Sequence, residues 1–415
     1  MNLQGDNSNM KPRTLSQTIE KARKTFPAIV ITGPRQSGKT TLLHMLFEKN
    51  YSYVNLENPD VRMRANADPN GFLSQYKPPL IIDEIQYVPT LLSYIKTAID
   101  KDRKPGQWLI TGSQNFALMQ NVSQSLSGRA AVFSLLPFSL MERCGLGDKA
   151  VSIDSLVSKG IGIQKETELP DLAEIILRGN YPEIASNKKV DRQIWCGSYI
   201  TTYLERDIRN LKQVGDLSQF EIFLRACAVR TGQILNLSGI SRDIGVSFST
   251  AKRWLSLLET GYQVYLLYPY YRNIGKRTIK SPKLYFTDTG LASYLLGLHK
   301  KESLIGSPHY GNLFETLVVT DFLKRSLNFG QIPSLYYLKT RDGLEVDLVI
   351  EVAGKLCLFE VKSSSTITEK HAVSLIQAAK DVKEVEKTAI ISTSEDSFVL
   401  GKGVRNYKWQ DILVT

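Results

Sequence analysis

The sequence predicts an α/β protein whose N-terminal part is built around a mostly parallel sheet. Five short apolar runs occupy residues 28–32, 52–56, 80–83, 108–111 and 131–135. Helical patterns separate these runs, most clearly at residues 39–49 and 89–100. Continuous apolar runs joined by helices are typical of parallel strands that are buried on both faces. After a mainly helical middle part, strands and helices mix again from residue 283 onward.

Composition narrows the class of protein further. The chain has 415 residues, 42% of them hydrophobic, which suits about two to four packed domains. No apolar run approaches the length of about 18 residues that a membrane helix requires, and residues 1–10 are too polar for a signal peptide. The scattered cysteines predict neither a disulfide framework nor a zinc ribbon, so we expect a cytoplasmic protein without membrane association. The net charge of +11 suits a nucleic-acid partner or simply a solvated basic surface.

A glycine-rich motif follows the first apolar run directly. Residues 33–40 fit G-x-x-x-x-G-K-T between a predicted strand and a predicted helix, the context that a phosphate-binding P-loop requires. Backbone N–H groups of such a loop hold phosphates, and its glycines allow an approach that a Cβ would block. Lys39 adds positive charge at the β- and γ-phosphates, and the Thr40 hydroxyl ligates Mg²⁺. The predicted ATP-binding residues are Gly33, Pro34, Arg35, Gln36, Ser37, Gly38, Lys39, Thr40 and Thr41.

Two acids end the apolar run 80–83. Asp83 and Glu84 thus stand at the carboxyl end of a predicted strand, where the sites of parallel α/β sheets lie. We expect Asp83 to orient Mg²⁺ through water and Glu84 to polarise the attacking water as a general base. The alternative is a pair that only caps the next helix, and the preceding P-loop favours the ATPase interpretation.

Two more residues are candidates for contact with the γ-phosphate. Ser113 follows the run 108–111, whose strand should lie beside the P-loop strand, although an ordinary strand-to-helix turn is the alternative. Arg129 precedes the run 131–135 and is a candidate arginine finger or sensor for the transferring phosphoryl group. It could act within its own chain or across a subunit interface, and its alternative is a surface salt bridge. The oligomeric state is open.

Eight stretches together resemble a known family. They are ITGPRQSGKTT at 31–41, LIIDEIQ at 80–86, ITGSQ at 110–114, SLSGRA at 125–130, LPFS at 136–139, YLERDIR at 203–209, FTDTGL at 286–291 and GNLFET at 311–316. The sequence resembles AAA-type P-loop ATPases of bacteria and archaea that carry a C-terminal domain of unknown function. The resemblance extends from about Thr14 over nearly the whole chain. It implies an AAA-like sheet with the strand of Glu84 near the P-loop strand, a winged helix in the middle, and a nuclease-like fold at the end.

The middle of the chain reads as helix, turn, helix at residues 237–244 and 247–260. Ser247 can cap the second helix, whose apolar side faces inward and whose polar side is outward near its start, where a recognition helix meets the major groove. Runs 264–271 and 283–286 could form wing strands joined by a basic loop. A winged helix that packs between domains is the alternative to double-stranded DNA binding. The predicted DNA-contacting residues are Ser249, Lys252, Arg253, Lys276 and Arg277.

Two apolar strands near the C-terminus carry charged residues on one face. Asp347 lies on the first strand, and Glu360 and Lys362 share a face of the second. Two carboxylates can share a divalent metal while a lysine orients water, and Glu315 could add a third carboxylate. The pattern is similar to that of PD-(D/E)xK nucleases, although Val346 replaces the usual proline. We expect a second divalent metal at Asp347 and Glu360, and the alternative is a charged surface hairpin.

We therefore expect four domains: a P-loop ATPase domain at 14–147, a helical lid or linker at 148–215, a winged helix at 216–282 and a nuclease-like domain at 283–415. The leading interpretation is a switch that binds and hydrolyses ATP and couples its nucleotide state to a C-terminal module that engages DNA or a protein. One alternative is an ATP-regulated, metal-dependent DNA nuclease. Another is a nucleotide-dependent binding module that does not hydrolyse ATP.

Overall fold

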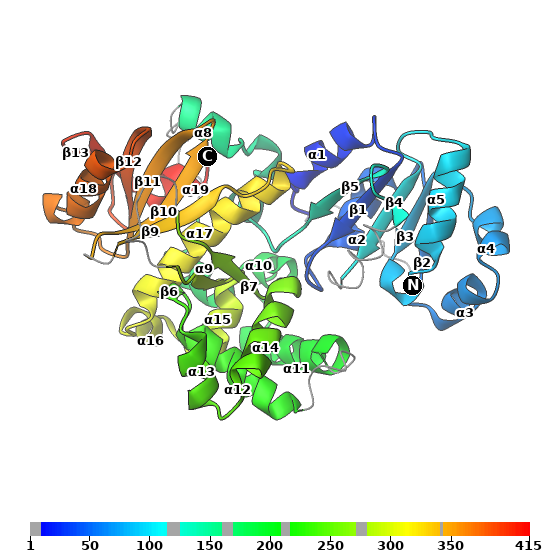
Figure 1. The fold of residues 1–415 in the computed structure, drawn as a ribbon, viewed down its shortest axis with the longest axis horizontal. Helices are drawn as coiled ribbons and strands as arrows, with labels where there is room; N and C mark the ends of the chain where they lie inside the picture. The colour runs from blue at the N-terminus through cyan, green and yellow to red at the C-terminus, as the bar shows by residue number, and fades with distance from the viewer. Residues whose placement is uncertain (1–9, 114–124, 160–168, 209–215, 271–279, 341–342) are drawn as a thin grey trace.

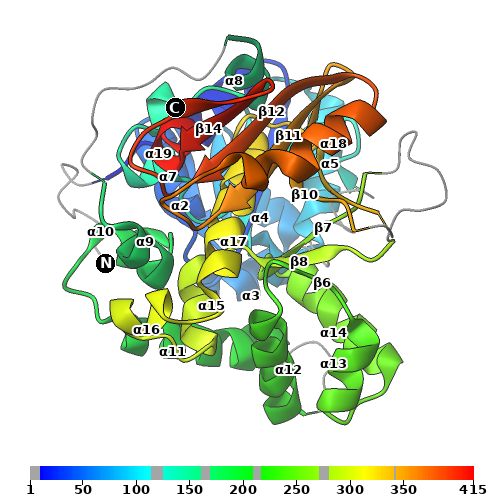
Figure 2. The same ribbon diagram turned by 90° about the vertical axis from the view of Figure 1, so that its left-hand side faces the viewer.

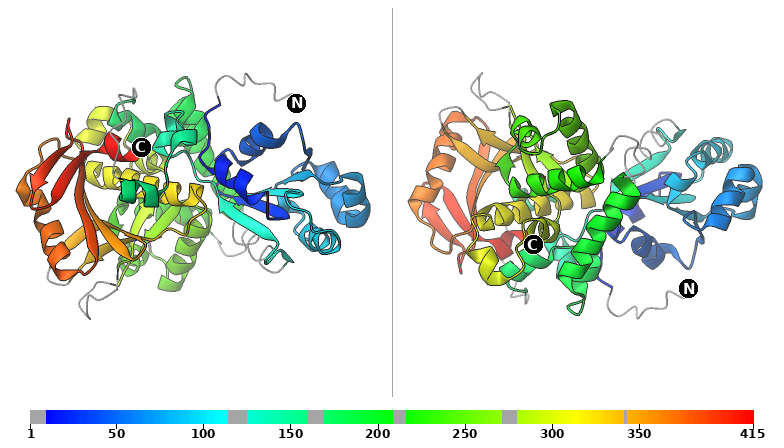
Figure 3. Two further views of the ribbon diagram at one scale, coloured as in Figure 1. Left: turned by 90° about the horizontal axis from the view of Figure 1, so that it is seen from above. Right: turned by 90° about the horizontal axis from the view of Figure 1, so that it is seen from below.

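Two large sheets stand at opposite ends of the molecule, and helices of the middle part lie between and below them (Figure 1). In the view along the long axis of the molecule the C-terminal sheet lies in front of the N-terminal part (Figure 2), and the views from above and from below again show the two sheets at opposite ends (Figure 3). The computed structural model describes residues 10–113, 125–159, 169–208, 216–270, 280–340 and 343–415.

The N-terminal sheet is parallel throughout, with strand order β2-β3-β4-β1-β5. Its strands are β1 (Ala28–Thr32), β2 (Ser52–Asn55), β3 (Leu80–Asp83), β4 (Trp108–Gly112) and β5 (Ala130–Ser134). The central strands β1 and β4 are buried along their whole length, as continuous apolar runs require. The predicted parallel α/β sheet is confirmed.

Helices cover both faces of this sheet. They are α1 (Leu15–Ala22), α2 (Lys39–Phe47), α3 (Pro59–Ala67), α4 (Pro69–Gln75), the short 3₁₀ helix η2 (Ile85–Tyr87) and α5 (Leu91–Lys101). Because side chains alternate along a strand, Ile29 and Ile31 of β1 pack with residues of α1 and α2, whereas Ala28 and Val30 pack with residues of α5. The carboxyl ends of the strands, where the P-loop begins, lie at one edge of these two layers.

The middle part is mainly helical. Its helices are α7 (Leu140–Arg143), η3 (Gly147–Lys149), α8 (Ile153–Lys159), α9 (Leu172–Arg178), α10 (Pro182–Ser186), α11 (Arg192–Thr202), the π-helical turn η4 (Tyr203–Ile208), α12 (Leu217–Val229), α13 (Leu237–Asp243), α14 (Phe248–Thr260), α15 (Thr289–Leu295) and α16 (Lys301–Ile305). A small antiparallel sheet accompanies them, with the order β6 (Gln233–Ile234), β8 (Lys283–Phe286), β7 (Val264–Leu267). The expected domain boundary at 282/283 therefore falls inside a sheet, because β8 pairs with β7 and β6 rather than with the C-terminal strands.

The C-terminal sheet is mixed, with strand order β13-β14-β12-β11-β10-β9. Its strands are β9 (Leu335–Lys339), β10 (Glu345–Val352), β11 (Lys355–Lys362), β12 (Val385–Ser392), β13 (Phe398–Gly401) and β14 (Val404–Lys408). The helices of this part are α17 (Tyr310–Asn328), η5 (Glu369–Ala372), α18 (Val373–Asp381) and α19 (Trp409–Leu413). Strands β9, β10 and β11 form an antiparallel meander, and β12 and β14 continue it in parallel with β11.

Helix α17 is the central element of the fold. It packs against β11, β8, β5 and α15, so it contacts all three sheets. Almost every residue of α17 after its first turn is buried, which fits a helix surrounded by other elements on all sides. Within the part of the chain that the structure describes, no helix, α17 included, is long and apolar enough to cross a membrane.

A buried carboxylate joins the N-terminal segment to α17. The Oε1 atom of Glu142 accepts hydrogen bonds from Arg13 Nε at 3.0 Å, from the Thr14 N–H at 2.9 Å and from Asn328 Nδ2 at 3.2 Å. Its Oε2 atom accepts from the Ser139 N–H at 2.9 Å and completes a capping box at the start of α7. Every contact is internal, since the Glu142 side chain is fully buried.

We predict that Glu142→Ala lowers the free energy of unfolding by about 3–5 kcal/mol, because it leaves the buried Arg13 guanidinium unpaired. The matched control is Glu20→Ala, which removes an Arg–Glu pair whose side chains are each 38% exposed and should change stability by about 0.5 kcal/mol or less. Urea unfolding followed by circular dichroism measures both. Equal effects of the two substitutions would contradict the prediction.

Candidate functional site

The P-loop has the backbone geometry of a phosphate cradle. Gly33 has a φ of +146°, and a Cβ at this position would lie 2.2 Å from the carbonyl oxygen of Leu135. Gly38 has a φ of +92° and precedes α2, so the N–H groups of the first turn of that helix face the loop. The Lys39 ammonium donates to the carbonyl oxygens of Gly33 and Pro34 at 3.1 and 2.8 Å. The glycines allow this curvature, and a side chain at Gly33 would clash with the backbone of Leu135.

Arg13, which was not predicted from the sequence, holds the P-loop in place. It donates from Nη1 to the Ser37 carbonyl oxygen at 2.8 Å and from Nη2 to that of Leu136 at 2.6 Å. The guanidinium is also paired with Glu142, so all its donors lie in the interior. Because Ser37 precedes Gly38 in the P-loop, Arg13 holds the curvature of the phosphate cradle.

Thr40 and Asp83 meet next to the loop. The Thr40 hydroxyl donates to the two carboxylate oxygens of Asp83 at 3.1 and 2.9 Å. Asp83 also accepts from the hydroxyl of Tyr53 at 2.9 Å and from that of Thr111. Burial and the Asp83 carboxylate raise the pKa of Tyr53, which keeps this donor protonated. A hydroxyl beside a carboxylate is a donor set suited to Mg²⁺, so these residues fit the ion that a P-loop uses.

Glu84 follows Asp83 in a left-handed conformation, with a φ of +57°. This backbone is uncommon for glutamate and turns its carboxylate toward the end of β4. The Glu84 Oε2 atom accepts from Ser113 Oγ at 3.2 Å and from the amide of Gln86, whose Nε2 also donates to Ser113 Oγ at 3.1 Å. The two predicted residues Glu84 and Ser113 therefore lie together, and Gln86 orients both.

A cavity of about 710 Å³ opens between the P-loop and the helices α11 and η4. Lys39, Thr40 and Glu84 line one wall, and the opposite wall includes Trp195 and Arg206. Seen from below, α11 lies beside the N-terminal sheet (Figure 3). The cavity thus places a phosphate cradle, an acid and apolar surface within one space that is large enough for a nucleotide.

Arg206 is a basic residue of this cavity. Its Nη2 atom lies 2.7 Å from Glu57 Oε1 and 3.1 Å from the Tyr87 hydroxyl. The hydrogen bond to Glu57 raises the pKa of Arg206, although burial opposes this. The π-helical turn η4 positions Arg206, so spacing along an ordinary helix could not have predicted the direction of its side chain.

The structure corrects the expectation for Arg129 within its own chain. Arg129 precedes β5, and its carbonyl oxygen accepts from the N–H of Ala28, the first residue of β1, at 3.2 Å. Because β5 and β1 are parallel, Arg129 lies at the amino edge of the sheet, a full strand length from the P-loop. Its Nε pairs with Asp100 at 2.5 Å, which is the surface salt bridge named as the alternative. A role across a subunit interface stays a prediction.

Three of the predicted DNA-contacting residues can be placed. Ser249, Lys252 and Arg253 are exposed near the start of α14, and Ser247 caps that helix by accepting from the Thr250 N–H at 3.1 Å. The other two, Lys276 and Arg277, lie outside the residues that the structure describes.

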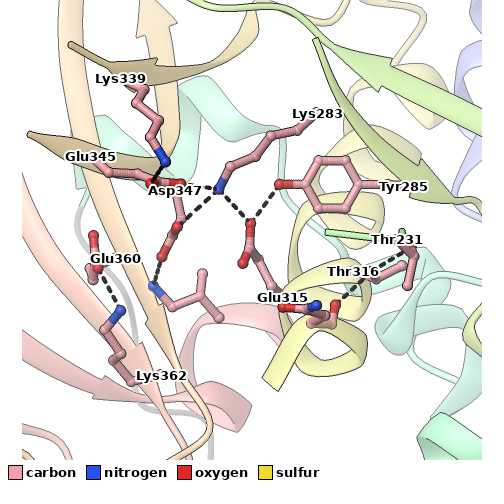
Figure 4. Close-up of polar contacts among 12 residues, drawn as sticks. Thr231, Lys283, Tyr285, Glu315, Thr316, Lys339, Glu345, Asp347, Glu360 and Lys362 are labelled. Carbon is pink, nitrogen blue, oxygen red and sulfur yellow. Dashed lines mark hydrogen bonds and ion pairs between the residues drawn. The ribbon is translucent and has the colours of Figure 1, made fainter. Parts of the chain in front are cut away.

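The C-terminal site residues form one cluster (Figure 4). Asp347 on β10 stands opposite Glu360 on β11, as the pairing of Leu348 with Phe359 requires. The Asp347 Oδ2 atom accepts from the Val361 N–H at 3.0 Å, and Lys362 Nζ lies 2.6 Å from Glu360 Oε1. Helix α17 brings in Glu315, so the structure places the predicted residues Glu315, Asp347, Glu360 and Lys362 in one region.

The cluster contains a lysine that the sequence did not predict. Lys283 of β8 extends its ammonium to within 3.0 Å of Glu315 Oε1, 3.0 Å of Glu345 Oε1 and 3.1 Å of Asp347 Oδ1. Tyr285, two residues along the same strand, donates to Glu315 Oε1 at 2.6 Å. The sequence offered one sign of this role, a lysine at an inward position of an otherwise apolar strand. Its partners could not be predicted, because they are remote in sequence.

Burial changes the proton affinity of two acids in this cluster. Burial and the neighbouring Asp347 carboxylate raise the pKa of Glu315 to about 7 and that of Glu360 to about 8. Among the described residues, no group of three or more His, Cys, Asp and Glu side chains is arranged to hold a metal ion. The expected second divalent metal at Asp347 and Glu360 does not fit the cluster as folded, because Lys283 Nζ lies 3.1 Å from Asp347 Oδ1 and Lys362 Nζ lies 2.6 Å from Glu360 Oε1.

Comparisons with known proteins agree with the N-terminal geometry. Residues 25–144 match an AAA domain, residues 169–302 match a domain of unknown function (DUF8612), and residues 310–412 match another (DUF4143). With the sheet and the P-loop, the first match defines the class: this is a P-loop protein of the AAA type.

The particular family follows from two relatives. Uncharacterized proteins of Mycobacterium tuberculosis and Mycobacterium bovis are each 30% identical to this chain over 409 residues, which is 97% of this chain and 85% of theirs. The chain belongs to their family.

Solved structures are more remote. A Walker-type ATPase of Pyrococcus abyssi is 14% identical with a TM-score of 0.44, over 69% of this chain and 99% of that one. A signal transduction ATPase with a tetratricopeptide repeat sensor from Pyrococcus horikoshii is 11% identical with a TM-score of 0.26, over 78% and 50%. Neither likeness is close enough to add to the assignment.

We predict that Glu315 and Glu360 make the protein less stable as the pH rises from about 4.5 to about 8. Because folding raises both pKa values, the folded protein binds more protons than the unfolded chain in this window, and their stabilisation is lost as the pH passes through about 7 and about 8. Glu360→Gln should therefore flatten the dependence of the thermal midpoint on pH.

The control for this measurement is Glu345→Gln. Burial raises the pKa of Glu345, but Lys283 and Lys339 lower it more strongly, so its removal should not flatten the same profile. A Glu360→Gln profile parallel to that of the unsubstituted protein would refute the assignment.

Proposed function

We propose that this protein is a switch that hydrolyses ATP at the cavity between the P-loop and η4 and transmits the nucleotide state to its C-terminal half. The observation that carries the proposal is the convergence of Lys39, the Thr40–Asp83 pair and Glu84 on one cavity of about 710 Å³. A phosphate cradle, a magnesium-binding pair and a carboxylate held by a hydroxyl and an amide are the parts that phosphoryl transfer to water requires.

Each residue has a role in the reaction. Lys39 exchanges its loop carbonyl partners for the β- and γ-phosphate oxygens. Glu84 accepts a proton from the attacking water, while Ser113 and Gln86 orient its carboxylate. The new P–O bond forms as the bond to the β-phosphate oxygen breaks, which gives ADP and phosphate. Mg²⁺, when bound at Thr40 and Asp83, neutralises charge on the phosphates.

Arg206 is the basic residue that we assign to the transferring phosphoryl group. It belongs to the same cavity as Glu84, whereas Arg129 lies at the other edge of the sheet. Its partner Glu57 also lines the cavity, and both side chains are nearly half exposed, so the pair can separate at small cost when a phosphate competes for the guanidinium.

A direct contact supports the coupling to the middle part. The Tyr262 hydroxyl lies 2.6 Å from Thr32 Oγ1 and 3.1 Å from Ser134 Oγ. Thr32 is the last residue of β1, directly before the P-loop, and Tyr262 precedes β7 of the small sheet. The Thr287 hydroxyl in turn donates to the Tyr262 carbonyl oxygen at 2.6 Å. A shift at the P-loop therefore reaches the unit that contains α14.

We predict that Glu84→Gln lowers the rate of phosphate release at least about 100-fold while ATP binding is retained, because it removes the proton acceptor and keeps the shape. Lys39→Ala should instead abolish binding. The controls are Glu48→Gln and Lys49→Ala, exposed positions at the end of α2. Phosphate release and fluorescent-nucleotide binding measure the two effects. If the unsubstituted protein releases phosphate as slowly as the Glu84→Gln variant, the protein is the binding module that does not hydrolyse ATP.

For the partner of the C-terminal half, we propose double-stranded DNA. Helices α13 and α14 with β6, β8 and β7 have the element order of a winged helix, and α14 presents Lys252 and Arg253 to solvent near its start. Exposed basic side chains at this position suit contacts with phosphates of the major groove.

We predict that Lys252→Glu combined with Arg253→Glu weakens duplex DNA binding roughly tenfold or more and reduces the slope of log affinity against log salt by about 2, since two phosphate contacts are lost. Fluorescence anisotropy over a range of salt concentrations measures both quantities. Lys101→Glu with Lys370→Glu, an equal charge change at other exposed sites, should have a smaller effect. If the two double variants have the same slope of log affinity against log salt, the start of α14 is not the DNA-binding surface.

A further inference from the structure

The ammonium of Lys283 sits where the carboxylates of the C-terminal cluster converge. A lysine has three N–H donors, and three carboxylate oxygens lie 3.0–3.1 Å from Lys283 Nζ, one each from Glu315, Glu345 and Asp347. Figure 4 shows these groups around the nitrogen. Each donor therefore has an anionic acceptor at the distance of a charge-assisted hydrogen bond.

This arrangement has no room for the expected metal. A magnesium or calcium ion needs oxygen ligands at about 2.0–2.6 Å, but the expected ligands already bind ammonium groups. Asp347 and Glu315 contact Lys283, and Glu360 contacts Lys362. A divalent cation in the same place would also have to stand beside a positive charge in the interior, which is strongly unfavourable.

We propose that Lys283 is a built-in cation: its ammonium, beside Asp347 and Glu315, takes the place of the divalent metal expected at Asp347 and Glu360. The cluster is then a metal-free ionic joint rather than a nuclease centre. It fastens β8 of the small sheet to α17 and to β10 of the C-terminal sheet, three elements that meet only through folding.

Burial makes this ionic joint depend on the positive charge of Lys283. The Lys283 side chain is 3% exposed, against 11% for Glu315 and 9% for Asp347. Burial lowers the pKa of Lys283, but the Tyr285 hydroxyl and the carboxylates raise it more, so the ammonium stays charged. Removal of the lysine would leave buried carboxylates without a counter-charge, and an available divalent cation would then become the favourable replacement.

Glu360 adds a further potential ligand to the emptied site. Its Oε2 atom is buried and has no hydrogen-bond partner in the described part of the chain, and it stands opposite Asp347. The metal-binding pattern is thus intact apart from the lysine, which makes a single substitution informative. The proposal is independent of ATP hydrolysis.

The experiment is a Mn²⁺ titration of the full-length, nucleotide-free protein, followed by electron paramagnetic resonance. Asp83→Asn is present in every sample to remove the P-loop metal site. With Lys283 in place, we expect no Mn²⁺ binding that depends on Asp347. Lys283→Met should lower the dissociation constant for Mn²⁺ at least about tenfold, because one buried positive charge is gone. Adding Asp347→Asn should abolish that gain.

Lys355→Met is the control, since Lys355 is an exposed lysine of β11, the strand that also carries Glu360, and its ammonium lies 3.5 Å from Glu386. It should leave Mn²⁺ binding unchanged. Near-ultraviolet circular dichroism checks that Lys283→Met is folded, and Lys283→Gln replaces it if it is not.

Three results would overturn the proposal. One is Asp347-dependent Mn²⁺ binding in the protein that retains Lys283. Another is cleavage of supercoiled DNA by the unsubstituted protein that is lost on Asp347→Ala. The third is a folded Lys283→Met or Lys283→Gln protein that gains no Mn²⁺ affinity. The first two need no Lys283 variant, so the proposal stays testable even if neither substitution folds.

Discussion

The buried ion pair between Arg13 and Glu142 connects the P-loop with the central helix α17. Arg13 holds the P-loop through Ser37, and Glu142 binds Asn328 at the end of α17. Both side chains are almost completely inaccessible to water, so neither charge could persist without the other. The nucleotide cradle is thereby tied to a helix that also contacts the small sheet and the C-terminal sheet.

The parallel sheet explains why the candidate ATP site is compact. The P-loop, Glu84 and Ser113 each follow the carboxyl end of a strand, and neighbouring parallel strands end at the same edge. By the same rule Arg129 lies away from the site, because Arg129 precedes β5 and therefore stands at the opposite edge of the sheet. Arg206 of η4 lines a wall of the cavity that belongs to the helical part of the chain.

Electrostatics differ between the two ends of the molecule. At the P-loop, Thr40 and Asp83 lie next to a cavity that admits a nucleotide, and the residues fit a metal. In the C-terminal cluster, comparable acids are satisfied by Lys283, and the residues do not fit one. Strand β8, which carries Lys283, pairs with β7, which follows Tyr262, so the ionic joint and the P-loop contact belong to one small sheet.

The strands of the N-terminal sheet, the P-loop and the acids at the end of β3 could be predicted from the sequence, because they depend on periodicity and spacing within a few residues. The sequence also predicted that Asp347, Glu360 and Lys362 share one face, which the pairing of β10 and β11 shows. Tertiary structure was needed to find the contacts of Arg13, Arg206, Tyr262 and Lys283, the place of β8 in the middle sheet, and the position of Arg129 at the far edge of the sheet from the P-loop. Their partners lie far away in sequence, and the burial that makes a charge or hydroxyl decisive exists only once the sheets have packed around α17.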